Sequence, residues 1–149
     1  MNFKKFYMGF FLFVILICSF FTQANAVVDI PTINSGSVVL LENSTSKVLF
    51  EKDMNKKLEP ASITKIMTAI LAIENCNLND IVTVPYEAIS NIPSGYSVAP
   101  LQADEQISVD QLLRVLMVHS ANDAANALAF HIDGSVSAFA ERMNAKLQA

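Results

Sequence analysis

The amino-acid sequence predicts a mixed α+β fold in which helices pack on an antiparallel sheet. Residues 35–53 contain two short apolar runs around a polar stretch, which is typical of a β-hairpin. Residues 63–73 and 108–147 instead repeat apolar side chains at intervals of three and four, which is typical of helices. With 149 residues, of which 52% are hydrophobic, the chain is long and apolar enough for one small domain.

The N-terminus has the composition of a secretory signal. Lys4 and Lys5 precede an apolar core at residues 10–21, and small residues follow at Ala24 and Ala26, the positions that a signal peptidase reads. We therefore expect cleavage after Ala26 and export of the remaining chain to the periplasmic or extracytoplasmic cell-wall space.

Two other interpretations of this segment fit less well. A membrane anchor needs about 20 apolar residues, more than this core provides. A lipoprotein signal has a small residue before its cysteine, whereas the bulky Ile17 precedes Cys18. The sequence thus predicts a signal peptide over residues 1–26 and a domain over residues 27–149.

Charge and cysteine content exclude several function classes. Residues 27–149 keep eight of the ten basic residues and all 14 acidic ones, a net charge of −6, which argues against nucleic acid or an anionic membrane surface as partner. Cys76 is the one cysteine of this part, so it has no internal disulfide partner. His119 and His131 are not clustered with it, and we expect neither a metal site nor a cofactor.

The hairpin is the first predicted element of the domain. Residues 38–41 and 48–50 are its apolar strands, and residues 42–47 are rich in turn formers. Because the runs are continuous, we expect helices to cover the strands on at least one face.

The next predicted element is a helix over residues 63–73, which begins shortly after Pro60. An apolar stripe recurs along it at helical spacing: Ile63, Ile66, Met67, Ile70 and Leu71. Its other faces also carry apolar side chains, so we expect it to be buried on more than one side.

A short strand is predicted over residues 81–85, followed by a loop-rich segment over residues 86–107 with room for one short helix. Ser108 and Gln111 form a capping-box pattern at the start of a further helix.

Two more helices complete the chain. The first has Asn122 or Asp123 as its expected N-cap, and the second follows Gly134. The second repeats apolar residues at intervals of four, namely Phe139, Met143 and Leu147.

Ser62 and Lys65 form the first candidate catalytic pair. Residues three apart on a helix are neighbours, so the hydroxyl and the amine can meet. A serine becomes a strong nucleophile when a base removes its proton, and a lysine can be that base where burial or nearby positive charge lowers its pKa. Lys65 lies opposite the apolar stripe of a largely apolar helix, which is such an environment. Ser-Lys pairs are a known variant of the serine-hydrolase constellation.

The same spacing also has a purely structural interpretation, in which Ser62 caps the helix and Lys65 is exposed. Ser44 and Lys47 repeat the pattern in the predicted hairpin turn, where no apolar helix follows, and we assign them to solvent. Spacing alone is therefore a weak signal.

Ser120 and Asn122 form the second candidate element, at the junction of two predicted helices. The hydroxyl can relay a proton, and the carboxamide can both donate to and accept from a substrate amide. The structural alternative is a polar turn with Asn122 as N-cap. His119 is next to Ser120, but consecutive helical residues point apart, so we interpret His119 and His131 as ordinary histidines.

Together these stretches resemble the penicillin-binding D-alanyl-D-alanine carboxypeptidases, the low-molecular-mass serine enzymes that trim peptidoglycan. The resemblance runs from about residue 35 to the last residue, and its most specific parts are PASITKIMT and SANDAAN. It implies the β-lactamase/DD-peptidase-like fold, peptidoglycan stem peptides ending in D-Ala-D-Ala as substrate, and β-lactam antibiotics as covalent inhibitors.

The resemblance also implies roles for the candidate residues. Ser62 would be the acylated nucleophile, and its backbone N–H would form half of the oxyanion hole. Lys65 would be its base, Ser120 the proton relay, and Asn122 the residue that holds the substrate amide.

Two departures from the family pattern matter. Ala121 stands where β-lactamases have an aspartate, which fits the carboxypeptidases better. The Lys-Thr-Gly element does not occur in the sequence, so we expect an N-terminal part of the catalytic domain with an open sheet edge and an uncovered apolar face. A D,D-endopeptidase, a class A β-lactamase or an inactive truncated fragment remain alternatives. Membrane association would need a C-terminal anchor outside this sequence.

Overall fold

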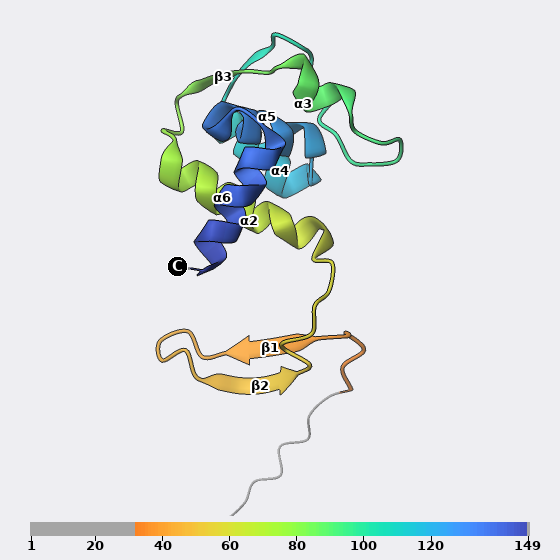
Figure 1. The fold of residues 1–149 in the computed structure, drawn as a ribbon, viewed down its shortest axis with the longest axis vertical. Helices are drawn as coiled ribbons and strands as arrows, with labels where there is room; N and C mark the ends of the chain where they lie inside the picture. The colour runs from red at the N-terminus through yellow and green to blue at the C-terminus, as the bar shows by residue number, and fades with distance from the viewer. Residues whose placement is uncertain (1–31, 149) are drawn as a thin grey trace, which may run out of the picture. The chain divides into compact units, whose positions relative to one another are not determined.

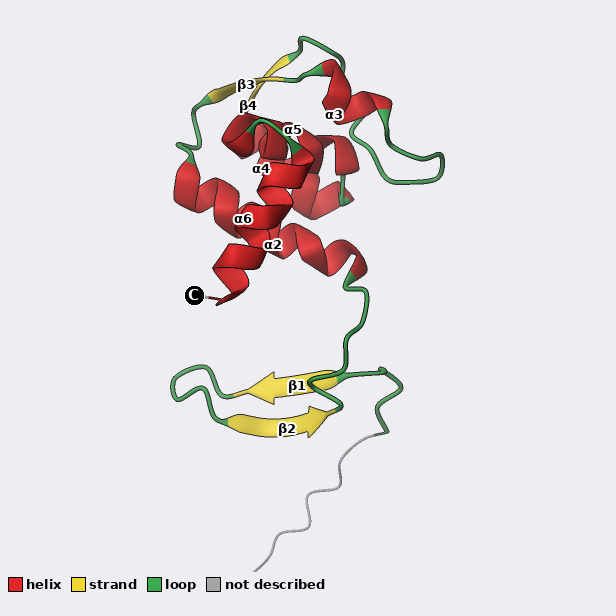
Figure 2. Ribbon diagram, viewed as in Figure 1, coloured by secondary structure: helices red, strands yellow, loops and turns green. Residues whose placement is uncertain are grey.

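The structure, a computed structural model, describes residues 32–148, so the predicted signal peptide over residues 1–26 lies outside the described part. The described residues form two compact units that divide between Lys56 and Lys57. Figures 1 and 2 show both units, and each is described here by itself.

The first unit is the predicted hairpin. Strands β1 (Val38–Leu41) and β2 (Val48–Lys52) pair antiparallel, and the register shifts between Leu40 and Leu41. Most of its apolar side chains are exposed, with Leu40 at 53%. The hairpin is therefore confirmed, whereas the predicted helical cover is not part of this unit.

The second unit is mostly helical (Figure 2). Its elements in chain order are the 3-10 turn η1 (Ala61–Ile63), α2 (Thr64–Asn75), β3 (Ile81–Thr83), α3 (Tyr86–Ser90), β4 (Gln106–Ser108), α4 (Val109–His119), α5 (Asn122–Asp133) and α6 (Val136–Gln148). Strands β3 and β4 pair antiparallel. The sequence prediction placed most of β4 in a loop-rich segment and missed it, because this strand depends on pairing with β3. Among residues 32–148, the helices all lack the length and apolar character that a membrane crossing requires.

Helix α5 lies at the centre of the second unit and packs against α2, α3, α4 and α6 (Figure 1). Its buried face is rich in alanine, including Ala124 and Ala127, which lets neighbouring helices approach closely. Leu112 and Leu116 of α4 and Leu128 of α5 fill the core and are almost completely buried. Full burial of one leucine side chain contributes roughly 1.5–3 kcal/mol.

The predicted capping box at the start of α4 is confirmed. The Ser108 hydroxyl accepts a hydrogen bond from the Gln111 backbone N–H at 3.2 Å, and Gln111 Oε1 accepts from the Ser108 N–H at 3.1 Å. The predicted caps of α5 are wrong, because Ala121 is the N-cap and makes no side-chain bond. Asn122 and Asp123 direct their side chains to residues 97–101 instead.

The predicted burial of α2 needs a correction. Of the apolar stripe only Leu71 is buried, while Ile63, Ile66 and Ile70 are exposed and line a groove beside α6. The buried face carries Thr68, Ala69 and Ala72 as well as Leu71. The small side chains Ala69 and Ala72 permit close contact with α4 and α5, so helix packing decided this orientation. Helical spacing places Lys65 on this inward face.

Candidate active site

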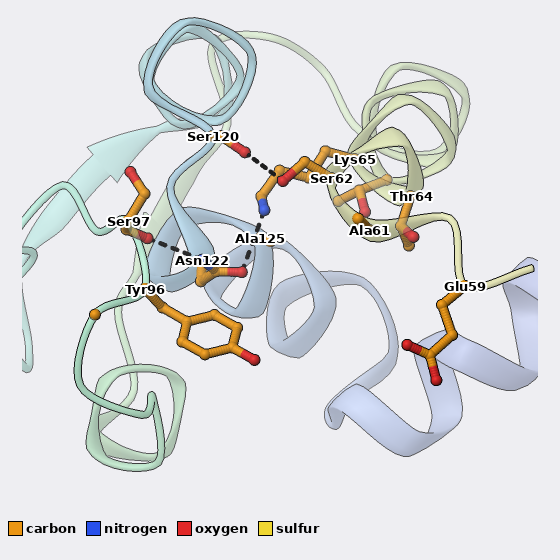
Figure 3. Close-up of a pocket in the computed structure, with 12 residues that line it drawn as sticks. Glu59, Ala61, Ser62, Thr64, Lys65, Tyr96, Ser97, Ser120, Asn122 and Ala125 are labelled. Carbon is orange, nitrogen blue, oxygen red and sulfur yellow. Dashed lines mark hydrogen bonds between the residues drawn. The ribbon is translucent and has the colours of Figure 1, made fainter. Parts of the chain in front are cut away.

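A cleft of about 630 Å³ lies in the second unit where three segments meet. These segments are the start of α2 with the turn before it, residues 95–97, and the junction of α4 and α5. Its lining residues are Glu59, Ala61, Ser62, Thr64, Lys65, Thr68, Gly95, Tyr96, Ser97, Ser120, Asn122 and Ala125. All four residues singled out in the sequence therefore line one cleft (Figure 3).

Ser62 lies in the 3-10 turn η1 and is exposed in the cleft. Ala61 before it adopts a left-handed backbone with φ of 46°, a conformation that costs a non-glycine residue on the order of 1–3 kcal/mol. Neither η1 nor α2 has a side-chain cap bond at its N-terminus. The alternative in which Ser62 serves as a helix cap is therefore wrong.

Ser120 brings a second hydroxyl to Ser62. It ends α4 in the left-handed conformation, with φ of 56°, and this turns the chain from α4 into α5. Its Oγ donates a hydrogen bond of 2.9 Å to Ser62 Oγ, although 58 residues separate the two serines (Figure 3). Two hydroxyls at this distance are within the range over which side chains transfer protons.

Lys65, near the start of α2, is half-buried and points into the cleft. Its Nζ donates to Asn122 Oδ1 at 3.2 Å. The hydrogen bonds of the described residues therefore join Lys65 to Asn122 and Ser62 to Ser120, and the expected contact between Ser62 and Lys65 is not among them.

The Asn122 carboxamide uses both of its ends. Its Nδ2 donates to the Ser97 carbonyl at 2.9 Å, while Oδ1 accepts from Lys65. The Ser97 carbonyl also accepts from the Asn122 backbone N–H at 2.9 Å. Asn122 thus connects the lysine of α2 with the segment around Ser97 (Figure 3).

The sequence prediction missed three residues in and beside the cleft, namely Tyr96, Ser97 and Asp123. Gly95, with φ of 90°, indicates a turn, but it does not indicate that Tyr96 and Ser97 line the same cleft as Ser62. Asp123 was expected only as a cap, because acidic residues are common in the first turn of a helix. In the structure it is 2% exposed and accepts from the backbone N–H groups of Ala99, Leu101 and Ala124.

The two histidines do not line the cleft. His119 and His131 are exposed, in line with the prediction that they are ordinary helix residues. Among residues 32–148, no group of three or more histidine, cysteine or acidic side chains is arranged to hold a metal ion.

Comparisons with known proteins agree with the geometry. Residues 23–149 match the D-alanyl-D-alanine carboxypeptidase family of peptidases. The D-alanyl-D-alanine carboxypeptidase DacF of Bacillus subtilis is 38% identical over 115 residues, which cover 74% of this chain and 29% of DacF. DacC of Escherichia coli is 36% identical over 129 residues, which cover 81% of this chain and 32% of DacC.

A solved structure shows the same fold. The crystal structure of penicillin binding protein 6B from Escherichia coli matches with a TM-score of 0.74 and 33% identity, covering 85% of this chain and 42% of that one. The chain thus spans about a third of the length of the two curated relatives.

Proposed function

The chain belongs to the D-alanyl-D-alanine carboxypeptidase family, and from this premise we propose that its protein is a serine-type carboxypeptidase of peptidoglycan. Its substrate is a stem peptide ending in D-Ala-D-Ala, and its product is the stem peptide without the terminal D-alanine. The fold is mixed, as the sequence predicts, and agrees with that of the penicillin-binding proteins.

The observation that supports this proposal best is the meeting of two hydroxyls and one amine in a single cleft. Ser62 Oγ is 2.9 Å from Ser120 Oγ, and Lys65 Nζ is 3.2 Å from Asn122 Oδ1. Acyl transfer needs a nucleophile, a base and a proton relay in one site, and this cleft holds one candidate for each. The two serines are hydrogen-bonded to each other, while Lys65 lines the same cleft and is bonded to Asn122.

We assign the acylation step as follows. Ser62 Oγ attacks the carbonyl of the penultimate D-alanine while Lys65 takes the hydroxyl proton. Ser120 donates its hydroxyl proton to the nitrogen of the departing D-alanine as the peptide bond breaks, and Lys65 returns the proton taken from Ser62 to Ser120. Asn122 holds the substrate amide, and the Ser62 backbone N–H stabilises the negative charge on the carbonyl oxygen. Water then hydrolyses the acyl-enzyme.

We further propose that the protein is exported through cleavage after Ala26 and contributes to cell-wall remodelling and cell shape. β-Lactam antibiotics should acylate Ser62, because they resemble the terminal dipeptide of the stem. The net charge of −6 over residues 27–149 argues against a nucleic-acid partner.

Fluorescent penicillin tests the assignment of Ser62. The full-length gene product should be labelled, Ser62→Ala should abolish the label, and Ser44→Ala should leave it unchanged. Equal labelling of the three proteins would contradict the proposal.

Mass spectrometry of digested muropeptides distinguishes a carboxypeptidase from an endopeptidase, because a carboxypeptidase releases D-alanine whereas an endopeptidase cuts cross-linked dimers.

A further inference from the structure

The Asp123 carboxylate is the most deeply buried acidic group of the cleft region, and its partners are all backbone donors. The Ala99 N–H lies 2.9 Å from both of its oxygens, and the Leu101 N–H lies 3.1 Å from Oδ2. A buried carboxylate is costly unless hydrogen bonds compensate it, and each of these bonds is charge-assisted. Asp123 therefore holds residues 99–101 against the first turn of α5.

The other end of the same segment is attached beside the cleft. Ser97 Oγ donates to the His119 carbonyl at 2.5 Å, and the Ser97 carbonyl accepts from both nitrogens of Asn122. Neighbouring residues of α5, Asn122 and Asp123, thus hold the two ends of residues 97–101.

This arrangement determines which end of the Asn122 carboxamide faces Lys65. Because Nδ2 is engaged by the Ser97 carbonyl, Oδ1 is directed at Lys65 Nζ. If residues 97–101 shifted, the carboxamide would lose the acceptor that orients it and could turn its NH₂ group toward the lysine.

We propose that Asp123 is a positioning residue for the Ser62 site, defined as Ser62, Lys65, Ser120 and Asn122. Its buried carboxylate holds residues 97–101, and through Ser97 it sets the orientation of Asn122 toward Lys65. The catalytic part of this inference rests on the proposed function, whereas the orientation of Asn122 can be measured without it.

Asn126 provides a matched control on the same helix. Its Nδ2 donates to the Ala88 carbonyl at 3.0 Å, so it also attaches the segment between β3 and β4 to α5. Asn126 does not line the cleft. Asn126→Ala should therefore cost stability without disturbing Asn122.

The experiment compares Asp123→Asn with Asn126→Ala in the full-length gene product. Asparagine keeps the volume of Asp123 but replaces one acceptor oxygen with an NH₂ group that faces N–H donors. Amide hydrogen exchange at Ala99 and Leu101, the side-chain NH₂ signals of Asn122 by NMR, and the acylation rate constant with fluorescent penicillin are measured below the melting temperature of each variant. If Asp123→Asn does not fold, the smaller Asp123→Ser takes its place.

We expect Asp123→Asn to speed exchange at Ala99 and Leu101 at least tenfold, to shift the Asn122 signals, and to slow acylation roughly tenfold or more, because small displacements of catalytic groups are costly. Asn126→Ala should keep the wild-type Asn122 signals and acylation rate. Unchanged Asn122 signals in Asp123→Asn, or an equal loss of rate in both variants, would overturn the inference. If the wild type is not labelled while the Asn122 signals respond as expected, the proposed function fails and the positioning role stands.

Discussion

Two stretches of this chain share the pattern Ser-x-x-Lys, and the structure gives them different surroundings. Ser44 to Lys47 form the exposed turn between β1 and β2, where Ser44 Oγ donates to the nearby Glu42 at 2.7 Å. Ser62 to Lys65 run from η1 into the first turn of α2, and the partners of Ser62 and Lys65 are Ser120 and Asn122, 58 and 57 residues further along the chain. Ser44 in the first stretch thus bonds to a neighbouring residue, whereas Ser62 and Lys65 in the second stretch bond to residues far away in the sequence.

The comparison shows that the Ser-x-x-Lys pattern alone does not identify a catalytic serine and lysine. In the turn, the Ser44 hydroxyl donates a hydrogen bond to the Glu42 carboxylate, and Lys47 is exposed to water. In the cleft, the hydroxyl receives a hydrogen bond from a second hydroxyl, and the lysine is half-buried against a carboxamide. Substitutions in the two stretches and in the residues bonded to them test this difference.

The largest effect is expected for the lysines. Lys65→Ala should slow acylation by fluorescent penicillin by a factor on the order of 10²–10⁴, because it removes the proposed base. Lys47→Ala should react at the wild-type rate. The rates are measured by time-resolved labelling. A Lys65→Ala variant that reacts within threefold of wild type would show that Lys65 is not the base.

A smaller loss of acylation rate is expected for Ser120→Ala, and Ser46, which has the same strained backbone conformation, serves as its control. Ser120 and Ser46 both have φ of 56°, so alanine at either position carries the same conformational cost. Ser120→Ala should slow acylation roughly a hundredfold, because it removes the hydroxyl bonded to Ser62. Ser46→Ala should not slow it.

Melting temperatures measured beside the rates separate strain from chemistry. Similar losses of stability in Ser120→Ala and Ser46→Ala, with a loss of rate only in the first, are the expected pattern. Equal rates in both variants would remove Ser120 from the mechanism.

The smallest effect concerns pH and the hairpin turn. The pKa of Glu42 lies at about 2, below its ordinary 4.5, because the Thr45 hydroxyl, then that of Ser44 and the backbone N–H groups of both donate to the ionised carboxylate. Since the folded turn favours the ionised form, its stabilisation is complete above pH about 4.5 and is lost as the pH falls toward 2.

An NMR titration of the Glu42 carboxyl measures this pKa. Thr45→Val removes the strongest donor and should raise the pKa toward 4.5, whereas Lys47→Ala should have little effect. A Glu42 that titrates normally in the wild type would show that Ser44 and Thr45 do not donate to it.

Local elements of the fold were predictable, and their contacts explain why. The capping box joins Ser108 to Gln111, and the hairpin turn joins residues 42–47, so both are encoded within a few residues. Strand β4 and the inward face of α2 were not predicted, because the first depends on pairing with β3 and the second on contact with α4 and α5.

Only those residues of the candidate site that lie in a family-typical sequence motif could be predicted from the sequence. Ser62, Lys65, Ser120 and Asn122 stand in two family-typical runs, and the structure places all four in one cleft. Ser97 and the holding role of Asp123 had no such signal, because a polar residue in a loop and an acid in a first helical turn are both common.

By itself, the sequence determined the hairpin, most helices, the family resemblance and the choice of Ser62/Lys65 over Ser44/Lys47, because these depend on neighbouring residues. Only the tertiary structure decided that the chosen pair meets Ser120 and Asn122, and that Asp123 holds the segment beside them. The physical reason is distance along the chain. The deciding hydrogen bonds join residues 22 to 58 positions apart, and they form only when α2, α4 and α5 pack together.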